Sequence, residues 1–275
     1  MRRLLLAAVI FGAAHGAYAA DMPDLPVLRG SLPDGLSSRT VNWQGYYIGG
    51  QAGYGSSDEN FNGSTSSLAA GVLADTLIES AMGVSQWNLQ LGKASARTSG
   101  YGAFAGYNSQ WDDVVIGVEM SYLHGKFGGS SSATEARSST AALADGLFHE
   151  VTATSAAAIS ISDMATFRAR AAYACGSFLP YMFGGVALGN ADISRSFTVQ
   201  DRGSVTQGGA SFPFVPLSAT EAVHNHLIYG YTAGLGVDVN LIGGLFMRAE
   251  WEYIRFTSTV DTSINTVRAG VGYKF

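Results

Sequence analysis

The chain contains little cysteine, little charge and no long apolar segment. Cys175 is the only cysteine, so the fold has no internal disulfide, and it lies too far from the N-terminus to carry a lipid anchor. Charged residues make up 13% of the 275 residues, against about 25% in soluble domains, which is too few for an ordinary soluble surface. The formal charge of −5 argues against a nucleic-acid partner, because phosphate binding requires a basic face.

The first residues have the pattern of a secretory signal peptide. Two arginines precede an apolar run at 4–14, and small residues in an Ala-x-Ala motif follow at 17–19. The run is shorter than the ~20 apolar residues that a membrane-spanning helix needs. We therefore expect residues 1–19 to be a signal peptide cleaved after Ala19, with cleavage after Ala20 as the less favoured alternative.

A proline-rich leader separates this signal from the main domain. Residues 20–42 hold three of the six prolines, together with Asp-Gly and Ser-Ser pairs. Such a composition predicts a flexible periplasmic segment, with a small plug or tether as the alternative. Residues 43–275 then form one domain, which is rich in glycine and aromatic residues but lacks any apolar run long enough for a transmembrane helix.

Apolar and polar residues alternate along this domain with the period of a β-strand. In one segment, for example, Phe167, Ala169 and Tyr173 alternate with Arg168 and Arg170. The eight segments with this pattern, of which the fifth is the least regular, are 43–57, 97–111, 114–127, 163–175, 178–197, 226–239, 245–259 and 264–275. A closed barrel with one face in lipid and one in its lumen explains both composition and pattern. We predict an all-β fold, an eight-stranded antiparallel up-and-down transmembrane β-barrel.

The predicted connections alternate between short and long. The short turns are 112–113, 176–177 and 240–244, the long connections are 58–96, 128–162 and 198–225, and the last connection, 260–263, is brief. Bacterial outer-membrane barrels have short periplasmic turns and longer external loops. The order therefore predicts long extracellular loops and places both termini in the periplasm.

Four stretches at matching positions along the chain resemble one family of small barrels. They are WQGYYIGG at 43–50, GAFAGYN at 102–108, RAEW at 248–251 and VGYKF at 271–275. In order and spacing they resemble the family that groups opacity-type surface proteins with OmpA-like transmembrane domains, also described as porin-family surface antigens. The resemblance implies an outer-membrane barrel surrounded by membrane lipids and lipopolysaccharide. It also implies that the outer-membrane assembly machinery recognises the last strand through Val267, Ala269, Val271, Tyr273 and Phe275.

Seven charged residues fall on the faces assigned to the lumen. They are Glu119, Arg168, Arg170, Arg248, Glu250, Glu252 and Arg268, three acids and four bases that nearly neutralise one another. An eight-stranded barrel is narrow enough for side chains to fill it, and buried charges persist only when they are paired. We expect a structural network of salt bridges; the alternative is a gated narrow pore in which the pairs exchange partners.

The sequence predicts no catalytic, cofactor or metal site. Enzymatic barrels need a nucleophile beside a base, and neither a His-x-Ser pair nor a Gly-x-Ser-x-Gly motif occurs. His224 and His226 are spaced so that they could reach one metal ion, but further ligands at suitable spacing are absent. We expect these two residues, and His149, to be exposed loop histidines. A lipid-modifying outer-membrane enzyme is the least favoured function.

A specific function would reside in the external loops, because loops on a rigid scaffold carry recognition. In the first loop, apolar residues at near-helical spacing between Leu68 and Met82 predict a short amphipathic helix. It either packs on the barrel rim or forms an adhesive patch. We expect a non-enzymatic barrel that supports envelope integrity and presents loops to an extracellular ligand or host surface. A small porin-like channel is the alternative.

Overall fold

The computed structural model describes residues 41–87, 89, 91–257 and 260–275, and β-strands make up most of them. The expected signal peptide at 1–19 lies outside the described residues. So does the expected leader at 20–42, apart from its last two residues.

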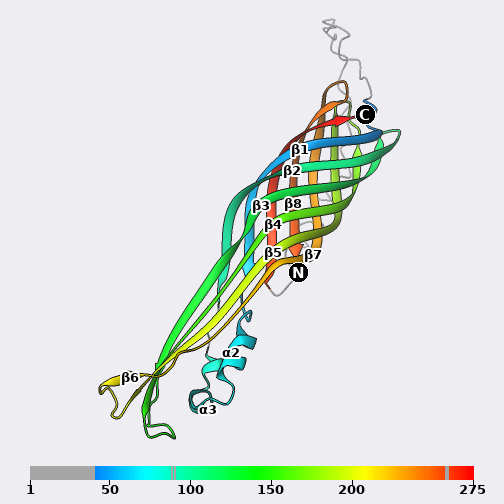
Figure 1. The fold of residues 1–275 in the computed structure, drawn as a ribbon. Helices are drawn as coiled ribbons and strands as arrows, with labels where there is room; N and C mark the ends of the chain where they lie inside the picture. The colour runs from blue at the N-terminus through cyan, green and yellow to red at the C-terminus, as the bar shows by residue number, and fades with distance from the viewer. Residues whose placement is uncertain (1–40, 88, 90, 258–259) are drawn as a thin grey trace, which may run out of the picture. The chain divides into compact units, whose positions relative to one another are not determined.

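Eight long antiparallel strands close into a ring (Figure 1). Their bounds are β1 (Gly45–Asn60), β2 (Lys93–Trp111), β3 (Val114–Ser138), β4 (Phe148–Tyr173), β5 (Phe178–Ser204), β7 (Leu217–Ile242), β8 (Leu245–Phe256) and β9 (Asp261–Lys274). Consecutive members of this series pair side by side, and β9 pairs with β1 to close the ring. The short β6 (Ser211–Pro213) lies on the edge of β5. The predicted eight-stranded up-and-down barrel is confirmed.

Side chains alternate between the outside of the ring and its lumen as the sequence pattern predicts. On β4, Phe167 and Tyr173 are exposed on the outside, whereas Arg168 and Arg170 are buried inside. Shifting the register by one residue would turn these arginines toward lipid. That would destabilise the folded barrel by about 2 to 4 kcal/mol for each arginine at mid-membrane depth. The register is therefore strongly specified.

Exposed aromatic side chains gather in two belts on the outer surface. One belt, near the short turns, consists of Tyr46, Trp111, Tyr173, Phe178, Tyr273 and Phe275; the other consists of Tyr54, Tyr101, Tyr122, Tyr229, Tyr231 and Trp251. Along β1, the separation of Tyr46 and Tyr54 corresponds to about 26 Å, comparable to the ~25 Å apolar band of outer-membrane barrels. The belts mark the membrane-spanning part of the ring, and the second is called the outer aromatic belt below.

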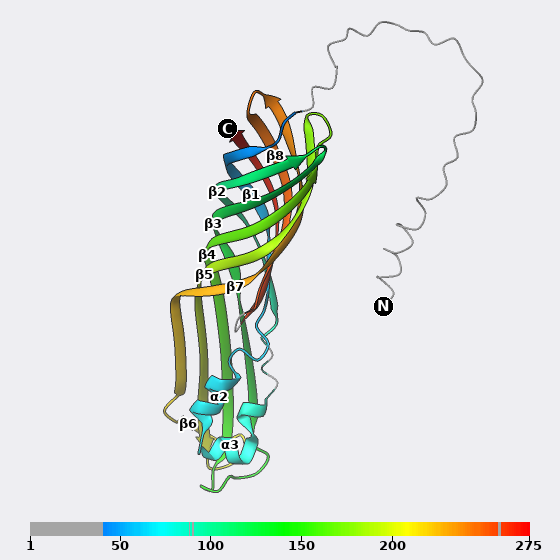
Figure 2. The same cartoon turned by 90° about the vertical axis from the view of Figure 1, so that its right-hand side faces the viewer.

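Four strands continue well past the ring as a sheet (Figures 1 and 2). This sheet extension consists of 127–138 of β3, 148–161 of β4, 193–204 of β5 and 217–223 of β7. The predicted long loops at 128–162 and 198–225 are therefore wrong over most of their length. The connections that remain there are 139–147 and 205–216, the second of which contains β6.

β-Bulges at the boundary between ring and extension explain this error. The pairing of β4 with both neighbours shifts between Ile161 and Asp163, and the pairing of β7 with β5 shifts where Asn225 has a φ of 53°. Relative to β5, each bulge adds one residue to its strand, so the inward positions of β4 and β7 change from even to odd numbers. The alternation breaks at these points, which are where the predicted strands begin.

The first connection folds against the extension (Figure 2). It contains two helices, α2 (Ser66–Leu73) and α3 (Leu77–Met82), instead of the single helix expected over 68–82. Asp75, at a φ of 60°, separates them, and the Thr76 side chain caps α3 by accepting a hydrogen bond from the Glu79 N–H. No helix in the described part of the chain is long and apolar enough to cross a membrane.

The loop helices pack their apolar side on strands, not on the barrel rim. Ala69, Leu73, Ile78, Val84 and Trp87 form a buried cluster with Val151, Ala153, Phe197 and Val199 of the extension. The loop therefore supplies the second layer of a small hydrophobic core. The segment was expected either to pack on the barrel rim or to form an adhesive patch. Its buried residues pack on the protein itself, but on the extension and not on the rim.

Candidate functional site

The lumen of the ring is filled in layers, which can be followed along β8. Phe246 belongs to an apolar cluster at the end with the short turns, and Ile254 and Phe256 belong to another at the opposite end. Arg248, Glu250 and Glu252 lie between these clusters on the same inward face. The charged layer is thus enclosed above and below by apolar side chains.

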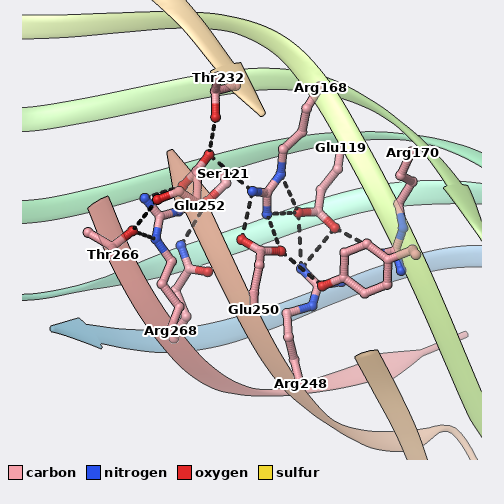
Figure 3. A network of polar contacts seen from close by, with 12 residues as sticks. Glu119, Ser121, Arg168, Arg170, Thr232, Arg248, Glu250, Glu252, Thr266 and Arg268 are labelled. Carbon is pink, nitrogen blue, oxygen red and sulfur yellow. Dashed lines mark hydrogen bonds and ion pairs between the residues drawn. The ribbon is translucent and has the colours of Figure 1, made fainter. Parts of the chain in front are cut away.

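All seven lumenal charges named from the sequence lie in this layer, where they are buried and joined in a network (Figure 3). Arg168 lies near its centre. It contacts Glu119, its Nη1 lies 2.7 Å from Glu250 Oε1, and the same Nη1 lies 3.2 Å from Glu252 Oε1. Three strands, β3, β4 and β8, therefore meet through one guanidinium.

An eighth charge, Asp238 on β7, completes the network and was absent from the predicted set. Arg248 Nε lies 2.8 Å from its Oδ1, and Arg170 Nη2 lies 2.7 Å from its Oδ2. Both arginines also reach Glu119, at 2.9 and 3.1 Å. With Asp238, four acids balance four arginines. Its position on the inward face of its strand was the sequence signal that could have identified it.

Arg268 forms the other end of the network. It pairs with Glu252 and donates from Nε to Thr266 Oγ1 at 3.2 Å. The Thr232 hydroxyl donates to Glu252 Oε1 at 2.7 Å, so together with Arg168 and Arg268 it holds this carboxylate from three strands. Hydroxyl side chains thus add hydrogen bonds to the ion pairs.

Aromatic side chains line the charged layer and were also missed as members of the site. Tyr47 donates to Glu119 Oε2 at 2.6 Å, and Tyr181 donates to Glu250 Oε2 at 2.9 Å. The Arg248 guanidinium lies 3.9 Å from the ring centre of Phe104. Lumenal glycines make room for these rings: a Cβ on Gly106 would lie 2.4 Å from Tyr47 Oη. A glycine paired with an aromatic residue on the neighbouring strand is therefore a sequence signal that could have identified aromatic residues in the lumen.

The network links several strands across the lumen. Taking charges out of water is costly, but each carboxylate here contacts a guanidinium, and most gain a hydroxyl donor as well. Removing one partner from a buried pair typically costs 3–5 kcal/mol because the other charge is left uncompensated. This geometry favours a static structural role over exchange of partners.

His149, expected to be an exposed loop residue, is instead buried on β4 in the sheet extension. Its Nδ1 lies 2.9 Å from Asp201 of β5, and its Nε2 lies 2.9 Å from Asp145 of the β3–β4 connection. Its ring stacks on Phe214 with centroids 5.3 Å apart. The expectation failed because distant strands supply these partners.

Opposing effects act on the imidazole. Burial lowers the pKa of His149, but the hydrogen bonds and charges of Asp201 and Asp145 outweigh it, so its pKa lies above the usual value. A doubly protonated ring donates from both nitrogens to the two carboxylates. It thereby ties the tip of the β3–β4 hairpin to β5.

The other predicted positions lie on the surface. His224 and His226 are exposed on β7, where His224 Nδ1 lies 3.5 Å from Asp192. The part of the chain that the structure describes contains no group of three or more His, Cys, Asp or Glu that could hold a metal ion. The residues of the predicted assembly signal all lie exposed along the outer face of the last strand: Val267, Ala269, Val271, Tyr273 and Phe275.

Comparison with known proteins agrees with this architecture. A family model described as "Outer membrane protein beta-barrel domain" matches residues 4–275. The chain belongs to this family. As a member of the outer-membrane β-barrel family, it is an outer-membrane protein, and its fold is the one that the family name states.

Two relatives are 25 kDa outer-membrane immunogenic proteins. The protein of Brucella ovis is 25% identical over 174 residues, which cover 63% of this chain and 62% of that protein. The protein of Brucella canis is 24% identical over 184 residues, with 63% and 64% covered. The chain thus spans about three fifths of the length of these curated relatives.

Among solved structures, similarity extends to other small barrels. Ail, the attachment invasion locus protein of Yersinia pestis, is 12% identical with a TM-score of 0.34, and the match covers 84% of this chain and 99% of Ail. Neisserial surface protein A is 13% identical with a TM-score of 0.31, and 84% and 97% are covered.

Proposed function

We propose that this protein is a non-enzymatic membrane anchor that presents its sheet extension at the cell surface, where the extension binds an extracellular ligand or host surface. Both termini and the short turns lie in the periplasm in this proposal. The filled ring supports envelope integrity, and the outward residues of β9 together with Phe275 serve as the signal for the assembly machinery.

The sheet extension carries the proposal. It reaches about 40 Å past the ring, as judged from 12 residues of β5 at ~3.3 Å each. It has its own apolar core, formed with the loop helices, which the ring does not need for closure. A structured element of this size, with a buried core of its own, is well suited to hold a recognition surface in a fixed geometry.

In the part of the chain that the structure describes, the extension also has two unpaired strand edges. β3 pairs with β2 only as far as Gly125, and β7 pairs with β8 only from Gly230 onward. Beyond these points, the outer edges of both strands present backbone groups that can accept a partner strand. Backbone pairing of this kind favours an extended protein segment as the ligand.

The histidine geometry argues against catalysis. A catalytic histidine needs one nitrogen directed at a nucleophile while the other is oriented by an acid. In His149, both ring nitrogens are already held by carboxylates, Asp201 and Asp145. The buried lumenal residues are likewise engaged in the ion-pair network, which favours a structural role for them.

Attachment assays on intact bacteria test the proposal. In the variant, residues 128–160 and 194–222 are each replaced by a two-residue Asn-Gly turn, and residues 62–91 by a short Gly-Ser linker, so that the ring remains. We expect cells with the full protein to attach to host-cell layers and cells with the variant to lose most of that attachment. A variant that inserts normally and attaches as well as the parent would refute the proposal.

Orientation is tested separately with the exposed Cys175 in the β4–β5 turn. On intact cells, a membrane-impermeant maleimide should label a cysteine introduced at Ser132 in a Cys175→Ser background, and should leave native Cys175 unlabelled until the membrane is opened. Labelling of Cys175 on intact cells would place the short turns outside and contradict the orientation.

A further inference from the structure

Two adjacent hollows lie on the outer face of the barrel, on the extension side of the outer aromatic belt. The first, of about 240 Å³, is lined by Tyr54, Ser56, Arg97, Trp251 and Asn265, among others. The second, of about 210 Å³, is lined by Asp58, Asn60, Lys93, Arg255, Asp261 and Ser263, among others. Both lie over β1, β2, β8 and β9, and we call them together the rim site.

The strand register places the charges of the rim site in an ordered pattern. Ser56 pairs with Arg97 of β2 on one side and with Asn265 of β9 on the other. Farther from the membrane, Ser263 pairs with Arg255 of β8. The cations therefore lie on the two flanking strands, while the middle strands, β1 and β9, carry small polar and acidic side chains.

The flanking cations are available to a ligand. Among the described residues, no carboxylate lies within ion-pair distance of Lys93 or Arg97, and both are exposed. Arg255 makes a long contact of 3.9 Å with Asp261, and both side chains are about half exposed. A phosphate could replace this weak surface contact at little cost.

The acids in the middle of the rim site restrict what can bind. A single phosphate centred in the hollow would approach Asp58 and be repelled. A ligand with two anionic groups at opposite ends of a sugar would instead place its charges over the flanking strands, β2 and β8. Its hydroxyl donors would then lie over Asp58, Asn60 and Asn265. Three strand spacings of ~4.8 Å and an offset of two residues along the strands separate Arg97 from Arg255, so their backbones lie about 16 Å apart and their side chains can hold two anions over opposite flanks.

The surface toward the membrane provides room for acyl chains. Ala52, Ala269 and Ala249 pair side by side across β1, β9 and β8, and all three are exposed on the outer face. Trp251 and Tyr54 lie between these alanines and the rim site, at the level where aromatic rings border the headgroup region. A lipid with its headgroup in the rim site can therefore lay its chains over small side chains.

We propose that the rim site binds the headgroup of a bisphosphorylated glycolipid of the outer leaflet, the lipid moiety of lipopolysaccharide. One phosphate is held by Arg97 and Lys93, the other by Arg255, and the disaccharide lies over the acidic centre. The inference rests on the proposed function, because the rim site faces the outer leaflet only if the extension is extracellular.

Binding to defined lipids tests the rim site. Purified, folded protein is titrated in neutral detergent with bisphosphorylated lipid A, monophosphorylated lipid A or phosphatidylglycerol, and the bound lipid is counted by native mass spectrometry. We expect the bisphosphorylated lipid to bind about tenfold or more tightly than either comparison lipid, since a second charge-assisted contact is gained. Equal affinity for the three lipids would overturn the proposal.

Variants locate the site. The double variant R97Q/R255Q should lose the preference for the second phosphate, and D58N/D261N should relax it by raising the affinity for phosphatidylglycerol. Arg202→Gln, which removes an exposed cation from the extension, is the matched control and should bind as the parent does. Unchanged binding by R97Q/R255Q would overturn the rim site. Because this assay is done in detergent, its outcome is separate from the Cys175 labelling that tests the orientation.

Discussion

The ring and the sheet extension are built partly from the same four strands, yet their polarity is reversed. In the ring, β4 points Phe167 outward and Arg168 inward. In the extension, the same strand buries Val151 and Ile159 on the side that faces the loop helices and leaves Thr152 and Ser160 on the opposite side less buried. The surroundings explain the reversal, since lipid requires an apolar outer surface and water requires a polar one.

The two regions also differ in how their backbones are satisfied. In the ring every strand has two neighbours, as hydrocarbon surroundings demand, because no water is available there to hydrogen-bond a free edge. The extension keeps two open edges, which only an aqueous environment tolerates. Ion pairs between arginine and carboxylate differ as well, since those in the lumen are buried whereas Arg195 and Glu221 in the extension pair at a partly exposed site. Within one chain, the residues on one side of the bulges meet the requirements of a membrane protein and those on the other side meet the requirements of a soluble one.

The largest expected effect comes from placing charges on the inward side of the extension. The double variant V151D/I159D puts two unpaired carboxylates at positions of β4 that are buried in apolar clusters of the extension. Because an unpaired buried charge costs several kcal/mol, the extension should lose on the order of 5 kcal/mol and unfold locally. Limited proteolysis of folded protein should then cut the extension and leave the ring intact. An extension that stays protected would show that its inward side is not an apolar core and that its polarity is not reversed.

A smaller but global effect is expected from Glu119→Ala. The change removes the carboxylate shared by Arg168, Arg170 and Arg248, at an expected cost of about 3–5 kcal/mol in the free energy of unfolding. Urea titration in detergent, read by heat-dependent gel migration, measures it. The matched control is Glu221→Ala, which breaks the half-exposed pair with Arg195 and should cost at most about 1 kcal/mol. Similar costs for both variants would remove the energetic distinction between the regions.

Glu59 provides a test at the boundary. Its carboxylate is buried near the apolar layer at the extension side of the ring, and neither oxygen has a hydrogen-bond partner among the described residues. Glu59→Gln removes the cost of burying an unpaired charge, so the protein should gain about 1–2 kcal/mol at pH 8. The same urea titration measures this gain. A loss of stability would indicate that an ionised Glu59 is needed.

The smallest expected effect is a pH dependence confined to the extension. The pKa of His149 is raised in the folded extension by its two carboxylate partners, so its stabilisation is fully present below the unfolded pKa of about 6.5. That stabilisation is lost as pH rises through the higher folded pKa. Hydrogen exchange of 139–147 should therefore be slower at pH 5.5 than at pH 8.5, after correction for intrinsic rates. His149→Gln should abolish the difference, and a pH dependence that persists in this variant would assign it to another group.

Several features of the ring could be predicted from local sequence alone. Strict alternation assigned Arg168 to the lumen and Phe167 to the outside, and short polar segments located the turns at 112–113 and 176–177. These assignments succeed because lipid on one face and a narrow lumen on the other impose the same two-residue period on every strand. The seven lumenal charges followed from the same pattern.

Other features were decided only by the tertiary structure. The extension escaped prediction because bulges at Ser162 and Asn225 change the phase of alternation and because its Ser, Thr and Ala side chains give a weak pattern. The partners of His149 and the place of Asp238 in the network depend on which strands meet after the ring closes. Alternation along a strand is a local property of the sequence, whereas contacts across a lumen or between a loop and a distant sheet exist only once the whole chain has folded.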